Sequence, residues 1–147
     1  MKIKLILDTS IENLTESLQD FEFIRLKCLV GFKSIDGYSY RFTEALVDTR
    51  AYISVIPSGL AKKIEKEILG EDKLKGINRR DECSIPVLVG KTSCILFDKD
   101  YNVTEDLLIR SYFAKTDEVP VILGFADVLS KFAVYVNYQR RIAYIEI

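Results

Sequence analysis

Residues 45–57 read ALVDTRAYISVIP, and this segment decides the fold. Three apolar residues lead into Asp48, a mixed stretch follows, and a second strand-like run over 54–56 is closed by Pro57. Short apolar runs bounded by turn residues are typical of buried strands. The segment therefore predicts two strands joined by a loop that begins at Asp48.

The residues before this segment predict a β-hairpin. Residues 23–32 are β-branched, aromatic and aliphatic, residues 34–37 have turn chemistry, and residues 38–47 resume a strand pattern. The second strand of this hairpin leads directly into Asp48.

The N-terminal residues predict a strand over 2–7 and then a helix. Thr9 and Glu12 have the spacing of a capping box, which predicts a short helix through about Gln19. We assign residues 1–22 to this N-terminal strand and helix, and residues 23–147 to the main part of a single globular domain.

After Pro57 the spacing of apolar residues predicts a helix from about Gly59 to Leu69 that ends at Gly70. The polar residues 71–82 predict an exposed excursion. The remaining expected elements are strands over 84–89, 92–97, 106–113 and 119–124, a short helical stretch over 125–131, and strands over 132–138 and 142–147.

Composition excludes several functional classes. The apolar fraction of 48% and charged fraction of 29% are ordinary for a globular protein. A net charge of −1 argues against nucleic acid or an anionic membrane as a partner. Since no apolar run approaches the roughly 18–20 residues that cross a bilayer, and no cleavage site follows the N-terminal apolar stretch, we expect a cytoplasmic protein.

The chain has no histidine, which excludes Ser-His and Cys-His catalytic pairs and histidine-bound zinc. Its three cysteines, Cys28, Cys83 and Cys94, share no close spacing, so we expect reduced, mostly buried thiols. No metal or other cofactor is expected. If the protein is a hydrolase, its acid–base chemistry must come from carboxylates, lysine or tyrosine.

A second segment, Val121-Ile122-Leu123-Gly124, follows some seventy residues after Asp48. The two segments together resemble the two signatures of retropepsin-like aspartic peptidases (clan AA, single-domain type). In that family an apolar strand delivers Asp-Thr-Gly-Ala into a loop and a Val-Ile-Pro-like segment follows. A later Ile-Leu-Gly then leads into a short helix. The resemblance extends over roughly residues 23–147.

The resemblance implies a fold and a reaction. The expected fold is mostly β, a closed β-barrel or sandwich of the acid-protease type with one or two short helices. The expected activity is hydrolysis of peptide bonds in polypeptide substrates by a homodimer, because each chain supplies one catalytic Asp.

The resemblance also implies residue roles. Asp48 of each subunit forms a dyad that shares one proton; one carboxylate takes a proton from water while the other polarises the scissile carbonyl. Thr49 braces the loop across the dimer, Ala51 completes the loop, and residues 71–82 form a flap around Lys75, Gly76 and Ile77. The strands over 132–147 are candidates for a sheet shared by the two subunits.

The chain departs from the family at three positions near the signatures. Arg50 replaces the glycine that follows Asp-Thr, and it could favour two ionised carboxylates or point away and leave the dyad competent. Tyr52 and Phe125 replace an acidic residue and an arginine that form an ion pair in retroviral members, so aromatic packing is expected there. Asp127 is expected to cap a helix.

A second Asp-Thr pair occurs at Asp8, after Leu5-Ile6-Leu7. It lacks a preceding hairpin and a following apolar-Pro segment, so we interpret Asp8 as structural. Asp48 itself also has a simpler interpretation, a turn Asp that bonds its own backbone. A catalytically inactive peptide-binding or dimerisation module stays open because of Arg50, and a nucleic-acid or regulatory scaffold has the least support.

Overall fold

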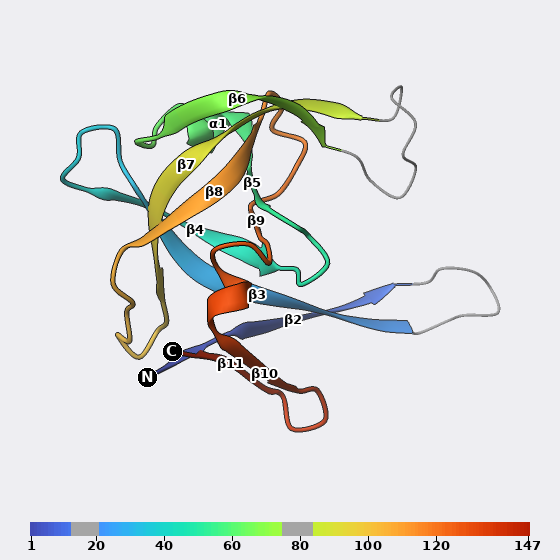
Figure 1. Cartoon of the computed structure of the whole chain (residues 1–147). Coiled ribbons are helices and arrows are strands. Elements are labelled where there is room, and N and C mark those ends of the chain that lie inside the picture. Colours follow the sequence, from blue (N-terminus) through green and yellow to red (C-terminus); the bar gives the residue numbers. More distant parts are fainter. Residues whose placement is uncertain (13–20, 75–83) are drawn as a thin grey trace.

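The computed structural model describes residues 1–12, 21–74 and 84–147. Most of them form strands, which lie in two sheets (Figure 1). The strands are β1 Lys2–Lys4, β2 Ile6–Glu12, β3 Phe21–Lys33, β4 Tyr40–Val47, β5 Ser54–Ile56, β6 Glu67–Leu74, β7 Ile85–Phe97, β8 Leu107–Ala114, β9 Ile122–Leu123, β10 Ala133–Asn137 and β11 Ile142–Glu146. One α-helix, α1, spans Ser58–Ala61, and a 3₁₀ turn spans Leu129–Lys131.

The larger sheet curls into a barrel-like shape. Its strand order is β2-β3-β4-β9-β5-β8-β7-β6, and β7 also pairs with β3. The pairing therefore runs from β3 through β4, β9, β5, β8 and β7 and back to β3. β3 makes this possible through its length, because residues 21–27 pair with β2 while residues 29–32 pair with β7.

The smaller sheet joins the two ends of the chain. β11 lies between β1 and β10, antiparallel to both. Figure 1 shows the termini beside each other, and the N–H of Ile147 donates to the carbonyl of Met1. Tyr135 of β10 and Tyr144 of β11 are in register, and their rings stack with centroids 4.9 Å apart.

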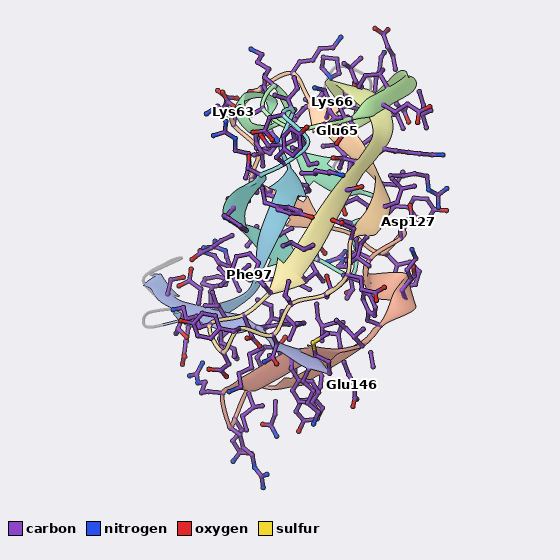
Figure 2. The ribbon with its side chains drawn as sticks, turned by 90° about the vertical axis from the view of Figure 1, so that its left-hand side faces the viewer. Lys63, Glu65, Lys66, Phe97, Asp127 and Glu146 are labelled. Carbon is purple, nitrogen blue, oxygen red and sulfur yellow. The ribbon has the colours of Figure 1, made fainter. Side chains whose placement is uncertain are left out.

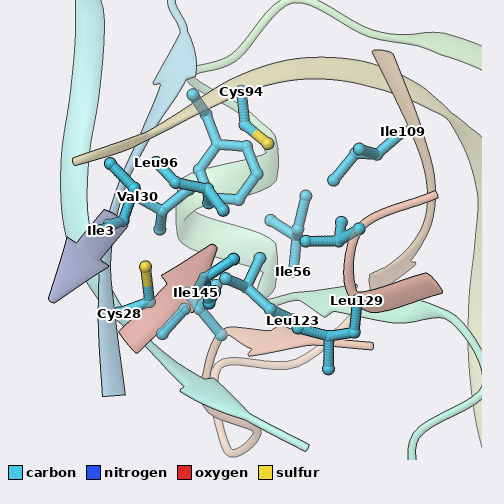
Figure 3. Close-up of a cluster of buried hydrophobic side chains, with 14 of the residues drawn as sticks. Ile3, Cys28, Val30, Ile56, Cys94, Leu96, Ile109, Leu123, Leu129 and Ile145 are labelled. Carbon is cyan, nitrogen blue, oxygen red and sulfur yellow. The ribbon is translucent and has the colours of Figure 1, made fainter. Parts of the chain in front are cut away.

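Buried side chains from both sheets form one hydrophobic cluster (Figure 3). It contains fully buried side chains from strands far apart in sequence, among them Ile3, Val30, Ile56, Leu96, Ile109, Leu123 and Ile145. Cys28 and Cys94 are buried free thiols, as expected, and burial raises the pKa of each to about 12. Cys83 lies outside the described residues.

The predicted hairpin is confirmed as β3 and β4, with Gly37 in its turn at a φ of +78°. That left-handed conformation favours glycine. The runs over 84–89 and 92–97 form the single strand β7. The predicted 125–131 helix is limited to the short 3₁₀ turn.

The helix predicted from Thr9 is wrong over the described residues 9–12, which continue β2. Thr9 is in register with Ile24 of β3. Local capping chemistry was outweighed because the long strand β3 offers a free edge to this segment. The rest of the predicted helix lies outside the described residues.

The helix predicted through Leu69 is also wrong, because α1 ends at Ala61. Ile64 is buried and forms an isolated bridge with Ser34, which draws the chain alongside the end of β3. Residues 67–74 then form β6, with an irregularity in the pairing with β7 between Ile68 and Gly70. The extra residue of this bulge disturbs the alternation of a strand, so apolar residues here mimic helical spacing.

No helix among the described residues is long and apolar enough to cross a membrane.

Candidate active site

Asp48 lies at the point where β4 ends and a loop to β5 begins. Its N–H donates to the carbonyl of Leu123 over 3.1 Å. Its Oδ1 accepts the N–H of Arg50 over 2.9 Å, and its carbonyl accepts the N–H of Ala51 over 3.2 Å. Asp48 is thus a turn Asp bonded to its own backbone. Within the described residues its Oδ2 has no hydrogen-bond partner and the side chain is partly exposed, so one carboxylate oxygen is available for chemistry.

The loop from Asp48 is supported by β9, which lies between the two strands that flank it. Ile122 and Leu123 are parallel to β4, and Ile122 is antiparallel to Val55 of β5. Of the residues predicted from sequence, Ile122, Leu123 and Gly124 are therefore brought directly against the Asp48 loop.

Gly124 is required at this crossing. A Cβ on Gly124 would lie 2.6 Å from the carbonyl carbon of Ile53 and 2.8 Å from the N of Ser54, closer than side chains approach backbone. The N–H of Gly124 donates to Ser54 Oγ over 2.9 Å, and Ser54 is fully buried. Ser54 was not among the residues predicted from sequence, where it stands out only as a polar residue inside an apolar run.

Two further backbone bonds hold the loop. The N–H of Phe125 donates to the carbonyl of Ala51 over 2.8 Å, and the N–H of Ala126 donates to the carbonyl of Tyr52 over 2.9 Å. The side chain of Tyr52 is 78% exposed and that of Phe125 is 49% exposed. The expectation that these aromatic side chains pack together as a substitute for an ion pair is therefore not supported.

Thr49 and Arg50 are exposed. Their side chains have no polar partner within the part of the chain that the structure describes. Arg50 is not among the described residues with positive φ, so its backbone conformation does not demand glycine. Any effect of Arg50 on chemistry must come from its charge and bulk.

Asp127 does not cap a helix, which corrects the prediction from sequence. The 3₁₀ turn has no side-chain cap, and Asp127 instead binds Arg110 of β8. Arg110 Nε donates to Asp127 Oδ2 over 2.7 Å and its NH2 donates to Oδ1 over 3.1 Å. The backbone N–H of Arg110 also donates to Oδ2 over 3.0 Å. Figure 2 shows Asp127 at the surface.

This ion pair shifts the pKa of both groups. The hydrogen bond from Arg110 lowers the pKa of Asp127 below its ordinary range, and the same contact raises the pKa of Arg110. Arg110 was not predicted from sequence, because the sequence around a charged residue on the outward face of a strand does not identify its partner.

The hairpin proposed as a flap is described only at its base. β6 and β7 pair from Glu67↔Lys91 to Leu74↔Ile85. The described part of β6 is exposed along most of its length, as expected for residues 71–74. Lys75, Gly76 and Ile77 lie outside the described residues.

Comparisons with known proteins show the fold. Neither a known sequence family nor a curated protein matches the chain. Among solved structures, the crystal structure of a retropepsin-like aspartic protease from Rickettsia conorii is similar, with a TM-score of 0.50 over 96% of this chain and 92% of that chain. The sequences are 14% identical, so the likeness establishes a mostly β, retropepsin-like fold and leaves the chemistry open.

Proposed function

We propose that the chain is a homodimeric aspartic endopeptidase that activates water at a dyad of Asp48 and its symmetry mate. The observation that carries the proposal is the position of Asp48. It begins a loop held by β9 between β4 and β5, in a fold similar to that of a known aspartic protease. Asp8, the other Asp-Thr position, has no such surroundings.

A single Asp48 cannot perform this chemistry, because the reaction needs a general base and a general acid together. A two-fold axis beside Asp48 brings two carboxylates into contact, and such a pair shares one proton. The dyad then titrates as one unit. The ionised member removes a proton from water while the protonated member donates a hydrogen bond to the scissile carbonyl.

The dimer needs surfaces near this axis and at the chain ends. Thr49 is exposed beside Asp48 and can bond across the axis. β11 already has both of its edges paired, and on the outer edge of β1 the N–H of Lys4 donates to Asp98, so among the described strands of this sheet β10 has the edge best suited to pairing between subunits. The β6–β7 hairpin is our proposed flap, which excludes water from bound polypeptide.

A catalytically inactive peptide-binding or dimerisation module is the second candidate, and Arg50 is the observation that favours it. Two exposed guanidinium groups beside the dyad favour two ionised carboxylates over one shared proton. That state lacks a general acid. Replacement by the family's glycine removes the charge and the bulk; since Arg50 is not at positive φ, the replacement relieves no backbone strain.

The test is digestion of an unfolded protein at pH values from 3 to 7, with fragments identified by mass spectrometry. The wild type, Asp48→Asn and Arg50→Gly are compared, and Asp8→Asn serves as the matched control. Cleavage by the wild type that is lost only in Asp48→Asn establishes the peptidase. Cleavage by Arg50→Gly alone selects an intact site silenced by Arg50. Absence of cleavage from all of these variants would contradict the peptidase proposal.

A further inference from the structure

We propose that Arg110 is a positioning residue, which through Asp127 fixes the backbone segment that holds the Asp48 loop in place. Its catalytic consequence rests on the proposed peptidase function; its structural part does not. Arg110 lies on β8 and Asp127 follows Gly124 by three residues, so the contact joins the barrel wall to the segment beside the loop.

The contact has an unusual number of bonds for an exposed ion pair. Two guanidinium N–H groups each donate to a different carboxylate oxygen, Nε to Oδ2 and Nη2 to Oδ1, and the backbone N–H of Arg110 adds a third bond, to Oδ2. A bidentate guanidinium–carboxylate pair fixes orientation as well as distance. The side chain of Asp127 is 21% exposed, so solvent competes weakly for its oxygens.

Asp127 is placed for this role by its backbone. Its φ of +66° is the left-handed region, which few residues other than glycine adopt and which Asp tolerates better than most. The three bonds from Arg110 offset the cost of holding that conformation within the turn over residues 125–128.

The constrained segment supports the loop through two bonds. Phe125 and Ala126 donate their N–H groups to the carbonyls of Ala51 and Tyr52. Ala51 in turn donates to the carbonyl of Asp48. A continuous path of hydrogen bonds and short backbone links therefore runs from Arg110 to Asp48. Loss of Arg110 frees Asp127 and loosens the loop at its far end.

The ion pair between Arg110 and Asp127 is suited to acidic conditions. The charged groups that face Asp127 are Arg110 from β8 and Lys131 from the 3₁₀ turn, and both favour its ionised form. The pKa of Asp127 therefore lies below its ordinary range, and the pair stays charged at an acidity where a free Asp begins to take up a proton.

Amide hydrogen exchange measured by NMR tests the structural part without any need for activity. In Arg110→Gln we expect the amides of Phe125 and Ala126 to exchange about 10-fold faster or more, while amides of β3 and β4 keep their rates. Arg110→Lys keeps the charge and loses the bidentate geometry, so exchange of these two amides should be intermediate between the wild type and Arg110→Gln. Lys115→Gln is the control, because Lys115 is a similarly exposed cation directly after β8, paired at 4.0 Å with Glu71.

Kinetics test the catalytic part. If the wild type cleaves peptides, Arg110→Gln should lower kcat about 10-fold and change KM less than about 2-fold, since the variant misplaces Asp48 and leaves substrate contacts. Exchange at Phe125 and Ala126 that is no faster than in Lys115→Gln overturns the inference, whether or not the wild type is active. A wild type without activity, with the expected exchange, removes the peptidase proposal alone.

Discussion

The chain contains two Asp-Thr pairs after apolar residues, and the structure gives them different surroundings. Asp8 lies within β2, in register with Arg25 of β3, and its carboxylate binds Lys27 Nζ over 2.7 Å. Asp48 lies after the last residue of β4, and its carboxylate binds only the local N–H of Arg50 among the described residues. The comparison teaches that the same dipeptide becomes a candidate site only where the strand stops and another strand supports the loop.

The largest expected effect separates the two aspartates by activity. Asp48→Asn should lower kcat/KM for peptide cleavage by about 1,000-fold or more, because in the proposed dimer it removes the ionisable group from both subunits at once. Asp8→Asn should keep activity within about 2-fold. Initial rates on a fluorogenic peptide at acidic pH measure both. Equal losses in the two variants would end the distinction between them.

The second prediction concerns the packing of Gly124 against the Asp48 loop, a support that Asp8 lacks. Gly124→Ala places a methyl group against the backbone of Ile53 and Ser54, which cannot withdraw. We expect the free energy of unfolding to fall by about 3 kcal/mol, the upper end for overpacking. Urea denaturation followed by tyrosine fluorescence measures it.

Gly70→Ala is the control for that variant. Nothing lies within 4 Å of a Cβ at Gly70, which is in an exposed strand with no positive φ. Its urea midpoint should stay close to that of the wild type. A Gly124→Ala protein as stable as Gly70→Ala would show that β9 does not press on the Asp48 loop.

The third prediction concerns two buried serines that are in register on β5 and β8. Ser54 Oγ accepts the N–H of Gly124, whereas Ser111 Oγ is buried without a partner among the described residues. Ser54→Ala should cost about 1–2 kcal/mol of unfolding free energy, because the N–H of Gly124 stays buried and unsatisfied. Ser111→Ala removes an unpaired hydroxyl and should be neutral or slightly stabilising. The reverse order of stability would contradict the assigned hydrogen bond.

The parts of the fold that could be predicted are those where local pattern and tertiary pairing agree. The β3–β4 hairpin and the apolar runs at Val55 and Ile122 have the same strand signal at both levels. The helices expected at Thr9 and before Gly70 failed because distant partners decided those segments. Residues 9–12 pair with β3. β6 pairs with β7, and its close approach depends on Gly90, where a Cβ would lie 2.2 Å from the carbonyl oxygen of Glu67.

The site shows the same division. The places of Asp48 and Gly124 could be predicted from their motifs: Asp48 follows the last residue of β4, and Gly124 is required where a Cβ would meet the backbone of Ile53 and Ser54. The contact of Arg110 with Asp127 could not, because it depends on the left-handed conformation at Asp127 and on which residue of β8 lies opposite. Neither property has a signature in a single sequence.

The smallest expected effect concerns how Asp8 and Lys27 respond to pH. The hydrogen bond from Lys27 lowers the pKa of Asp8 below its value of about 3.9 in an unfolded chain. A lowered carboxyl pKa stabilises the fold above the unfolded value, and that contribution is lost as the pH falls through the folded pKa. Asp8→Asn should therefore lower the urea midpoint at pH 6, and the difference from the wild type should shrink as the pH falls below the ordinary Asp value.

This measurement is best made in the Asp48→Asn background, where cleavage of the protein by itself cannot interfere. A double-mutant cycle with Lys27→Gln isolates the pair, and its coupling should be largest at pH 6 and should shrink as the pH falls below the ordinary Asp value. Because both side chains are partly exposed, salt should reduce the coupling as well. A coupling unchanged by pH would mean that Asp8 acts through packing in β2, and the contrast with Asp48 would then rest on strand position alone.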